Sequence, residues 1–195
     1  MDHFSGVGHF PAALEDGQAA VRWMRSHAGQ YAIKPQKIAA IGFSAGAQLA
    51  ALLGTTNHAE AAQDATSARV QAVVAVSGPY DFYRFADAPD NTGLAYYFGG
   101  TYREVPDRYR AASPILLASK DSAPFLLLSG ADDPLVLPKN DDLMADALRK
   151  HGVTVETIRV KNAGHVLAPV DGKQTDPPFP MVMLRVAEFL DRHIR

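Results

Sequence analysis

Apolar positions recur along the chain in two patterns, one typical of buried strands and one typical of helix faces. Four apolar runs have the length and composition of buried strands: 38–42, 70–76, 125–129 and 153–160. Around them, apolar residues recur three or four positions apart, which is the spacing of a helix face. Strands that alternate with helices are typical of a parallel sheet covered on both faces. We therefore expect one α/β domain over residues 1–195.

Four helices are predicted around these strands. The first begins after Pro11 and the last opens at Pro180, because proline tolerates the first position of a helix. The second spans 45–53 and closes at Gly54, and the third spans 141–151. Each of the four adjoins a predicted strand, as the flanking layers of such a sheet require.

Residues at about 80–118 interrupt this alternation with an aromatic-rich insertion. An irregular aromatic segment between two strands can line an apolar ligand pocket. It can equally pack on itself as a surface excursion with a small core of its own, and the two interpretations are compatible. If the segment forms a substrate pocket, its candidate residues are Phe43, Tyr80, Phe82, Tyr96 and Tyr97.

Composition excludes several classes of function. The 195 residues suit one domain with a sizeable core, and 47% hydrophobic with 21% charged residues is globular composition. A net charge of −2 gives no electrostatic reason to expect nucleic acid or a membrane surface as a partner. The absence of cysteine excludes disulfides, thiolate metal sites and a cysteine nucleophile. With no membrane-spanning run and no signal peptide pattern, we expect a cytoplasmic protein.

The segment 42–46 reads Gly-Phe-Ser-Ala-Gly and lies where a predicted strand ends and a predicted helix begins. A sharp turn at this place strains the serine backbone and lifts its hydroxyl above the sheet, as a nucleophile requires. We expect both glycines to leave room that side chains would obstruct. The helix N-terminus would offer N–H groups and partial positive charge to a developing oxyanion. Ser44 is thus a candidate nucleophile, and the alternative is an ordinary helix N-cap.

Two later loops supply an acid and a base. Asp132 and Asp133 directly follow the strand predicted at 125–129, and His165 directly follows the strand predicted at 153–160. The carboxyl ends of parallel strands meet at one edge of the sheet, which is also where Ser44 lies. Of the seven histidines, His165 alone has this position.

Three segments resemble esterases of the α/β-hydrolase superfamily. The run from Phe10 to Leu53 resembles the nucleophile region of the carboxylesterase, hormone-sensitive-lipase-like and feruloyl- or acetylxylan-esterase-like branch. The stretches PFLLLSGADDPLVLP and VKNAGHVLAP resemble the acid and histidine loops of that group. Serine, acid and histidine also follow one another in the chain order of that superfamily.

The resemblance implies a role for each of these residues. Ser44 would attack an ester carbonyl, His165 would move the proton, and Asp133 would orient the imidazole. The acid of this family directly precedes a proline, which favours Asp133 and leaves Asp132 with a loop-shaping hydrogen bond. The backbone N–H of Ala45 would be one oxyanion donor. Neither a metal nor an organic cofactor is implied.

The chain also departs from the family pattern. Such esterases carry a His-Gly-Gly-Gly-type loop upstream of the serine, which supplies further oxyanion donors, and this sequence has none. Only 43 residues precede Ser44, so we expect a truncated α/β-hydrolase fold. Gly6 and Gly8 are candidate replacement donors, and a neighbouring subunit is another. The alternative for this segment is a frayed terminus.

Loss of strands would leave the strand at 38–42, or a near neighbour, as an apolar sheet edge. Such edges aggregate or pair with another chain, so we expect a homo-oligomer or a swap of N-termini between subunits.

These observations favour a serine esterase acting on small or short-acyl carboxylic esters, with a small-molecule substrate as partner. A carbohydrate deacetylase or a peptidase would use the same triad. A hypothesis of a different class is a weakly active or non-catalytic binding module that keeps the fold without the oxyanion hole.

Overall fold

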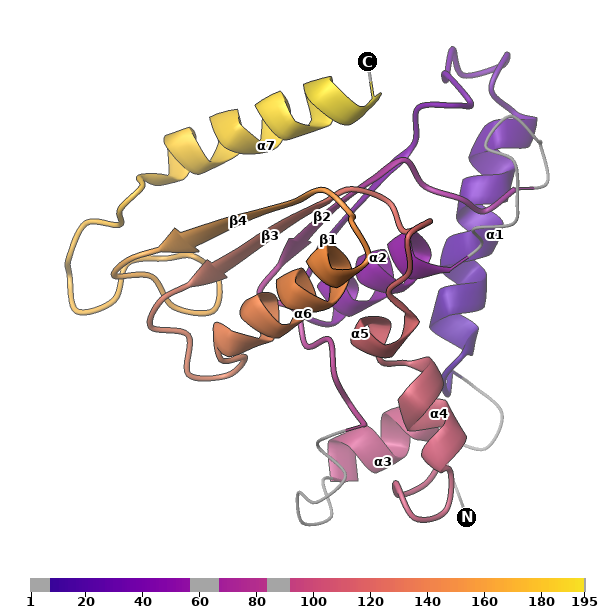
Figure 1. Ribbon diagram of the computed structural model, residues 1–195, viewed down its shortest axis with the longest axis horizontal. Coiled ribbons are helices and arrows are strands. Elements are labelled where there is room, and N and C mark those ends of the chain that lie inside the picture. The colour runs from indigo at the N-terminus through magenta and orange to yellow at the C-terminus, as the bar shows by residue number, and fades with distance from the viewer. Residues whose placement is uncertain (1–7, 57–66, 84–91, 195) are drawn as a thin grey trace.

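The computed structural model describes residues 8–56, 67–83 and 92–194 and contains one four-stranded parallel sheet (Figure 1). The strands are β1 (Ala39–Phe43), β2 (Ala72–Val76), β3 (Phe125–Gly130) and β4 (Val155–Val160), and their spatial order is their chain order. Neighbouring strands pair in parallel throughout. The four strands predicted from the apolar runs are therefore confirmed, each within two residues of its expected bounds.

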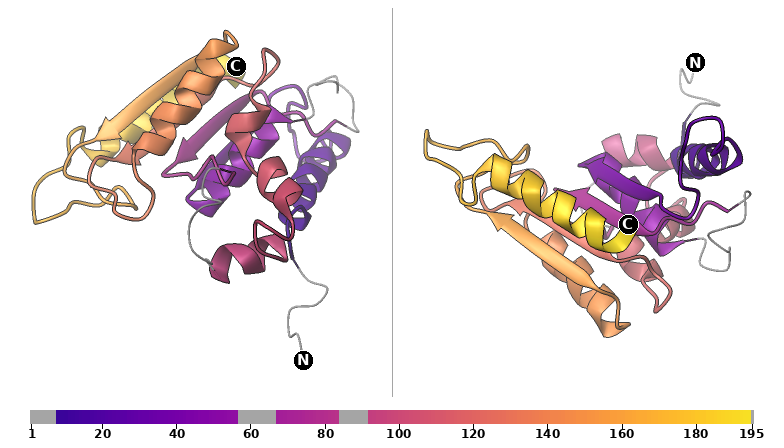
Figure 2. Two further views of the ribbon diagram at one scale, coloured as in Figure 1. Left: turned by 60° about the horizontal axis from the view of Figure 1, so that its bottom comes forward. Right: turned by 90° about the horizontal axis from the view of Figure 1, so that it is seen from above.

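Helices cover both faces of the sheet. Helices α1 (Ala12–Ser26), α2 (Ala45–Thr55) and α6 (Lys139–Lys150) belong to one layer, and α7 (Phe179–Ile194) covers the opposite face (Figures 1 and 2). Strands β2 and β3 are almost entirely buried because they are covered on both sides. The predicted α/β class, a parallel sheet flanked by helices on both faces, is thus confirmed.

Two apolar clusters hold these layers together. On the layer with three helices, Phe125 and Leu127 pack with Met144 and Leu148 of α6 and with small residues of α2. On the opposite face, α7 contributes Val182, Val186 and Phe189, which pack on Val74, Leu126 and Leu128. This alternation of side chains along β2 and β3 is what a strand with two buried faces requires.

The aromatic insertion forms a core of its own. It includes the short helices α3 (Thr92–Phe98), α4 (Pro106–Ala111) and α5 (Pro114–Leu117). Its rings pack with residues at the start of α1 and on α2. The buried members of this cluster are Phe10, Leu14, Leu52, Phe82, Phe98, Tyr109 and Ala112.

The buried guanidinium of Arg25 ties together the segments that lead into β1 and β2. Arg25 is 3% exposed and donates to the main-chain carbonyls of Pro35 at 2.9 Å and Ser67 at 2.6 Å. It also donates to the carbonyl of Arg69. A buried cation is tolerated here because backbone oxygens take up its donors. Arg25 therefore holds the segments that precede β1 and β2, and β1 is the strand that leads to Ser44.

Strand β1 is an outer strand with apolar side chains on its surface. Its residues pair with β2, and no strand pairs with its other edge within the described ranges. Ile41 is 61% exposed and Phe43 is 44% exposed. The exposed apolar edge predicted at this strand is therefore present in the structure.

No helix in the part of the chain that the structure describes has both the length and the apolar character needed to cross a bilayer.

Candidate active site

Ser44 occupies a tight turn between β1 and α2. Its backbone has φ of 55° and ψ of −120°, a region that residues other than glycine rarely adopt. Its N–H donates to the carbonyl of Val76 at 2.8 Å, and its side chain makes no capping hydrogen bond to α2. Ser44 is therefore not an ordinary N-cap, and its hydroxyl is left for other partners.

The two glycines of the turn differ in what they permit. A Cβ atom at Gly42 would lie 2.0 Å from the carbonyl oxygen of Gly46, so no side chain fits at position 42. At Gly46 an added Cβ would meet nothing within 4 Å. The expectation that both glycines make room for the turn is correct for Gly42 and wrong for Gly46. Only Gly42 lies against main-chain atoms of the turn, those of Gly46 and Ala47.

The structure brings Ser44, His165 and Asp133 into one chain of hydrogen bonds. His165 Nε2 lies 2.9 Å from Ser44 Oγ, and His165 Nδ1 lies 2.8 Å from Asp133 Oδ2. With the ring proton on Nδ1, that nitrogen donates to the carboxylate and Nε2 accepts from the serine hydroxyl. The side chain of His165 is 14% exposed and that of Asp133 is fully buried. The arrangement can take a proton from Ser44 while water is kept from the carboxylate.

The loop after β3 holds the Asp133 carboxylate in its charged form. Burial raises the pKa of Asp133, but hydrogen bonds from the Val136 N–H, from His165 and from the Leu135 N–H outweigh it, and the pKa lies below its usual value. The Leu135 and Val136 amides donate to Oδ1, at 2.8 and 3.0 Å, leaving Oδ2 for the imidazole. The negative charge is thus fixed beside His165.

Asp132, the less favoured acid, does not reach the imidazole. It is exposed, and its backbone N–H donates to the carbonyl of Ala163 at 3.0 Å. The acid and histidine loops also pass so closely that a Cβ at Gly130 would lie 2.2 Å from the same carbonyl oxygen. Asp132 therefore helps to join the two loops through its main chain.

Three contacts position the histidine loop from outside. The hydroxyl of Ser77, at the end of β2, donates to the carbonyl of His165 at 2.9 Å. The ring of Phe43 lies against the imidazole, with 5.0 Å between ring centroids. The third is the bond from Asp132 described above. Sequence reasoning missed Ser77, because nothing local marks a serine that contacts a residue 88 positions later.

Of the residues expected to line a substrate pocket, the structure brings Phe43 to the site. Tyr80 is 1% exposed and Phe82 is 7% exposed, so both are core residues and not pocket walls. Tyr97 donates from its hydroxyl to Gln48 and packs against the core of the insertion. Tyr96 is half-exposed but contacts His9. Tyr80 packs in the main core and Phe82 in the core of the insertion, and the assignment of Tyr96 and Tyr97 to a substrate pocket stays a prediction.

The candidate oxyanion donors are placed unequally. Ala45 is the first residue of α2, so its N–H has no acceptor within the helix. Gly6 lies outside the described residues. Gly8 is exposed, and the next residue, His9, is bonded through Nδ1 to the carbonyl of Tyr96 at 2.6 Å. Gly8 therefore lies beside the aromatic insertion, and no contact of it with Ser44 is found.

The N-terminus of α2 carries no compensating charge. Helix α2 has no acidic residue in its first turn, as is also true of α3, α5 and α7, whereas α1, α4 and α6 each have one. An acidic residue there would offset the partial positive charge of the helix dipole. The field at Ser44 is therefore left positive, which favours an oxyanion.

A second buried carboxyl lies close to the acid loop. Asp141, in the first turn of α6, is 2% exposed, and burial raises its pKa to about 6. Ser129 and Tyr80 hydroxyls and the charge of Arg159 oppose that rise, while Asp142 adds to it. Sequence reasoning placed this residue at a helix start, where an acid is common, and gave no sign that it would be buried.

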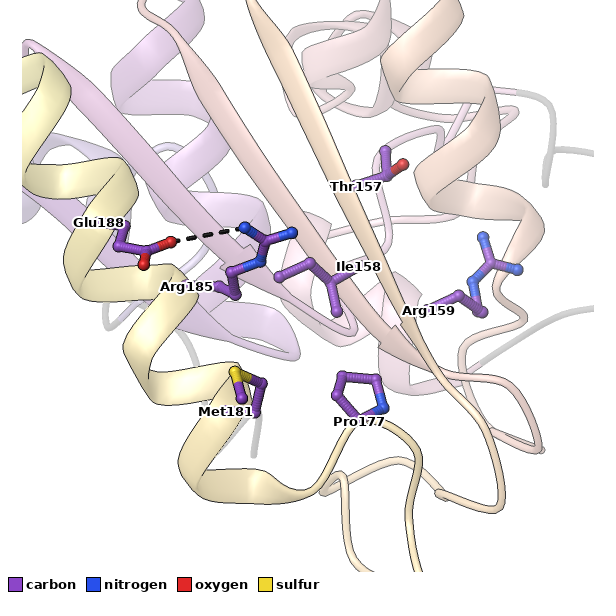
Figure 3. Close-up of a pocket in the computed structure, with 7 residues that line it drawn as sticks. All are labelled: Thr157, Ile158, Arg159, Pro177, Met181, Arg185 and Glu188. Carbon is purple, nitrogen blue, oxygen red and sulfur yellow. Dashed lines mark ion pairs between the residues drawn. The ribbon is translucent and has the colours of Figure 1, made fainter.

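A pocket of about 450 Å³ lies away from the triad, between β4 and α7 (Figure 3). Its walls include an ion pair between Arg185 and Glu188 at 3.5 Å, and none of the predicted site residues lines it. Across residues 8–56, 67–83 and 92–194, no cluster of three or more histidine, aspartate or glutamate side chains could hold a metal ion.

Comparison with known proteins places this geometry in context. The BD-FAE family model matches residues 2–148. Esterase LipQ of Mycobacterium tuberculosis is 31% identical over 163 residues, which cover 80% of this chain and 39% of LipQ. The chain therefore spans about two fifths of the length of that curated relative.

Solved structures give the same result. A truncated form of a carbohydrate esterase from gut microbiota superimposes with a TM-score of 0.73 at 29% identity, covering 82% of this chain and 63% of that one. Esterase Est2 of Thermogutta terrifontis gives 0.70 at 26% identity, covering 91% and 62%. Since the family model covers most of the sequence and the solved neighbours share the fold, the chain belongs to the BD-FAE family of α/β-hydrolase esterases.

Proposed function

We propose that this chain carries the catalytic centre of a serine esterase that hydrolyses small or short-acyl carboxylic esters. The observation that supports it is the hydrogen-bonded chain from Ser44 through His165 to Asp133, with distances of 2.9 and 2.8 Å. Relatives named as esterases support the same reaction class.

The reaction proceeds in two halves. As Ser44 Oγ attacks the ester carbonyl, its proton passes to His165 Nε2, and a tetrahedral oxyanion forms. Collapse of that species transfers the proton to the leaving alcohol and leaves an acyl group on Ser44. Water then gives its proton to His165 and attacks the acyl carbonyl, and the acid departs as Ser44 recovers its proton. Asp133 stabilises the imidazolium in both halves.

The oxyanion would be stabilised from the N-terminus of α2. The N–H of Ala45 is one donor, and the uncompensated helix dipole adds to its effect. Removing a single oxyanion donor lowers turnover by about 10²–10³ in known hydrolases, so a further donor matters. Gly6, which lies outside the described residues, and a neighbouring subunit stay candidate sources of that donor.

The surroundings of the triad favour an ester with an apolar part. Leu135 follows the acid by two positions and is 73% exposed, and Val166 follows the histidine and is 64% exposed. Phe43 lies against the imidazole, and we propose that Leu135 and Val166 join it in an apolar rim, which would suit a short acyl chain or an aromatic alcohol. The likeness to a carbohydrate esterase adds acetylated sugars to the substrates to test.

Hydrolysis of p-nitrophenyl acetate and butyrate by the purified chain and by Ser44→Ala tests the proposal. We expect activity that the substitution abolishes, and covalent labelling of the original chain alone by a fluorophosphonate. Equal hydrolysis by both proteins would show that Ser44 is not the nucleophile. Binding of a substrate analogue with neither turnover nor labelling would favour the non-catalytic module instead.

We further propose that a second copy of the chain covers the open edge of β1. Exposed apolar strand edges pair with other strands, and Ile41 and Phe43 lie on this one. Light scattering on the purified chain should give at least twice 21.0 kDa, whereas a stable monomer would contradict the proposal.

A further inference from the structure

The end of β2 contacts all three segments that carry the triad. The carbonyl of Val76 accepts from the Ser44 N–H at 2.8 Å. The N–H of Ser77 donates to the carbonyl of Leu128, in the strand that leads to Asp133, at 2.7 Å. The hydroxyl of Ser77 donates to the carbonyl of His165 at 2.9 Å. Two adjacent residues thus touch the nucleophile turn, the acid strand and the histidine loop.

Ser77 is held in a conformation that glycine would adopt more easily. It is 1% exposed and has φ of 50°, in the left-handed region where a Cβ is crowded. Glycine at this position would relieve the crowding. What serine provides instead is the buried hydroxyl and its bond to His165.

That bond acts on the main chain of the base itself. The bond from Asp132 reaches the loop two residues earlier, at Ala163, and the bond between Gly164 and Ala168 lies within the loop. Asp133 and Phe43 contact the imidazole ring, and the bond from Ser77 holds the main chain from which that ring extends. Proton transfer depends on the 2.9 Å separation of His165 Nε2 and Ser44 Oγ, and a small displacement of a reacting group costs up to about 10²-fold in rate.

We propose that Ser77 is a positioning residue for this esterase: its hydroxyl holds the His165 main chain so that Nε2 stays within reach of Ser44. The inference rests on the proposed function. Ser77 touches neither the substrate nor the reacting atoms, so its loss should slow the chemical step and leave substrate binding intact.

Two substitutions separate positioning from general stability. Ser77→Ala removes the hydroxyl and keeps the crowded backbone, whereas Ser77→Gly removes the hydroxyl and relieves the crowding. Ser129→Ala is a matched control, because Ser129 is also 1% exposed at the end of a strand, and its hydroxyl interacts with Asp141 and not with the histidine loop. The readouts are kcat and KM for p-nitrophenyl butyrate, active-site titration with a fluorophosphonate, and Tm.

We expect kcat per titrated site to fall roughly 10- to 100-fold in both Ser77 variants, with KM within about twofold, and Ser129→Ala to keep kcat. Ser77→Gly should have a higher Tm than Ser77→Ala and yet be no more active. If activity followed Tm, or both variants kept their kcat, the inference would be wrong. Ser44→Ala, measured alongside, distinguishes the two failures: activity that survives it overturns the proposed function, whereas its loss together with unimpaired Ser77 variants overturns this inference alone.

Discussion

The two outer strands of the sheet are built for different surroundings. On β4, Glu156 pairs with Arg192 of α7 and Arg159 pairs with Asp142 of α6. On β1 the corresponding surface is apolar, with Ile41 and Phe43 exposed. Charged residues on an outer strand protect it from pairing with another chain, and apolar residues do the opposite. One edge is therefore suited to water, while the other is suited to being covered.

The candidate triad joins these two ends of the sheet. Ser44 follows the apolar strand β1, whereas His165 follows the charged strand β4, and Asp133 follows β3 between them. The candidate nucleophile therefore follows the outer strand that lacks charged residues to protect it from pairing with another chain. The following predictions test that comparison, beginning with the largest expected effect.

Removing the charge of Asp133 should have the largest effect, which is on catalytic activity. Asp133→Asn removes the charge that holds the imidazole, and kcat for p-nitrophenyl acetate should fall roughly 10³–10⁴-fold. Hydrogen bonds keep the pKa of Asp133 below its usual value, so the defect should persist at every pH above about 5. Asp132→Asn is the matched control one residue earlier and should stay within about twofold. Equal losses in both variants would place the acid elsewhere.

Arg25, near β1, and Arg159, on β4, should differ in their contribution to the free energy of unfolding. Arg25→Met leaves several main-chain carbonyls near β1 without their hydrogen-bond donor. It should lower the free energy of unfolding by about 2–4 kcal/mol. Arg159→Met removes a partly exposed pair beside β4 and should cost about 1 kcal/mol or less. Urea unfolding of both variants measures the difference. A larger loss for Arg159→Met would reverse the comparison.

The buried carboxyl near β4 should destabilise the fold once it ionises. Because the pKa of Asp141 is raised to about 6, the unfolded chain ionises first, and stability falls as pH rises from about 4 to 6. Asp141→Asn should therefore stabilise the protein by roughly 2–3 kcal/mol at pH 8. This gain should shrink by pH 5 and vanish near pH 4. Tm measured across this range would refute the assignment if the gain were independent of pH.

The smallest effect, on association, tests the edges directly. Ile41→Lys places a charge on β1, and Thr157→Lys places one on β4, where the residue is already exposed. If β1 is covered by a second copy, the first variant should weaken association about tenfold or more and the second should not. Sedimentation at several concentrations would show it. Equal behaviour would mean that β1 is not the contact surface.

The strands and the meeting of Ser44, His165 and Asp133 were predictable from the sequence because each has a local signature. Apolar runs of strand length mark β1 to β4, and the glycine turn at Ser44 and the loops at Asp133 and His165 each directly follow one of them. Parallel pairing then brings the strand ends to one edge. Chain order and strand position were enough to choose His165 among seven histidines.

What escaped prediction depends on contacts between distant segments. Tyr80 and Phe82 look like pocket residues in a sequence, and only the packing of Tyr80 in the main core and of Phe82 in the insertion shows that they are buried. Ser77 meets His165 across 88 positions, with no pattern to mark it. The space around Gly46 depends on what lies beside the turn, which the motif does not record.

The bare N-terminus of α2 has a consequence for anyone who wishes to engineer this protein. Consensus rules for thermostability recommend an acidic side chain in the first turn of a helix, and the open space at Gly46 would admit one. Gly46→Glu would satisfy that rule and replace a flexible glycine, but its charge would repel the oxyanion that the proposed mechanism forms beside Ala45. At this turn a more robust molecule and a faster one are different design targets.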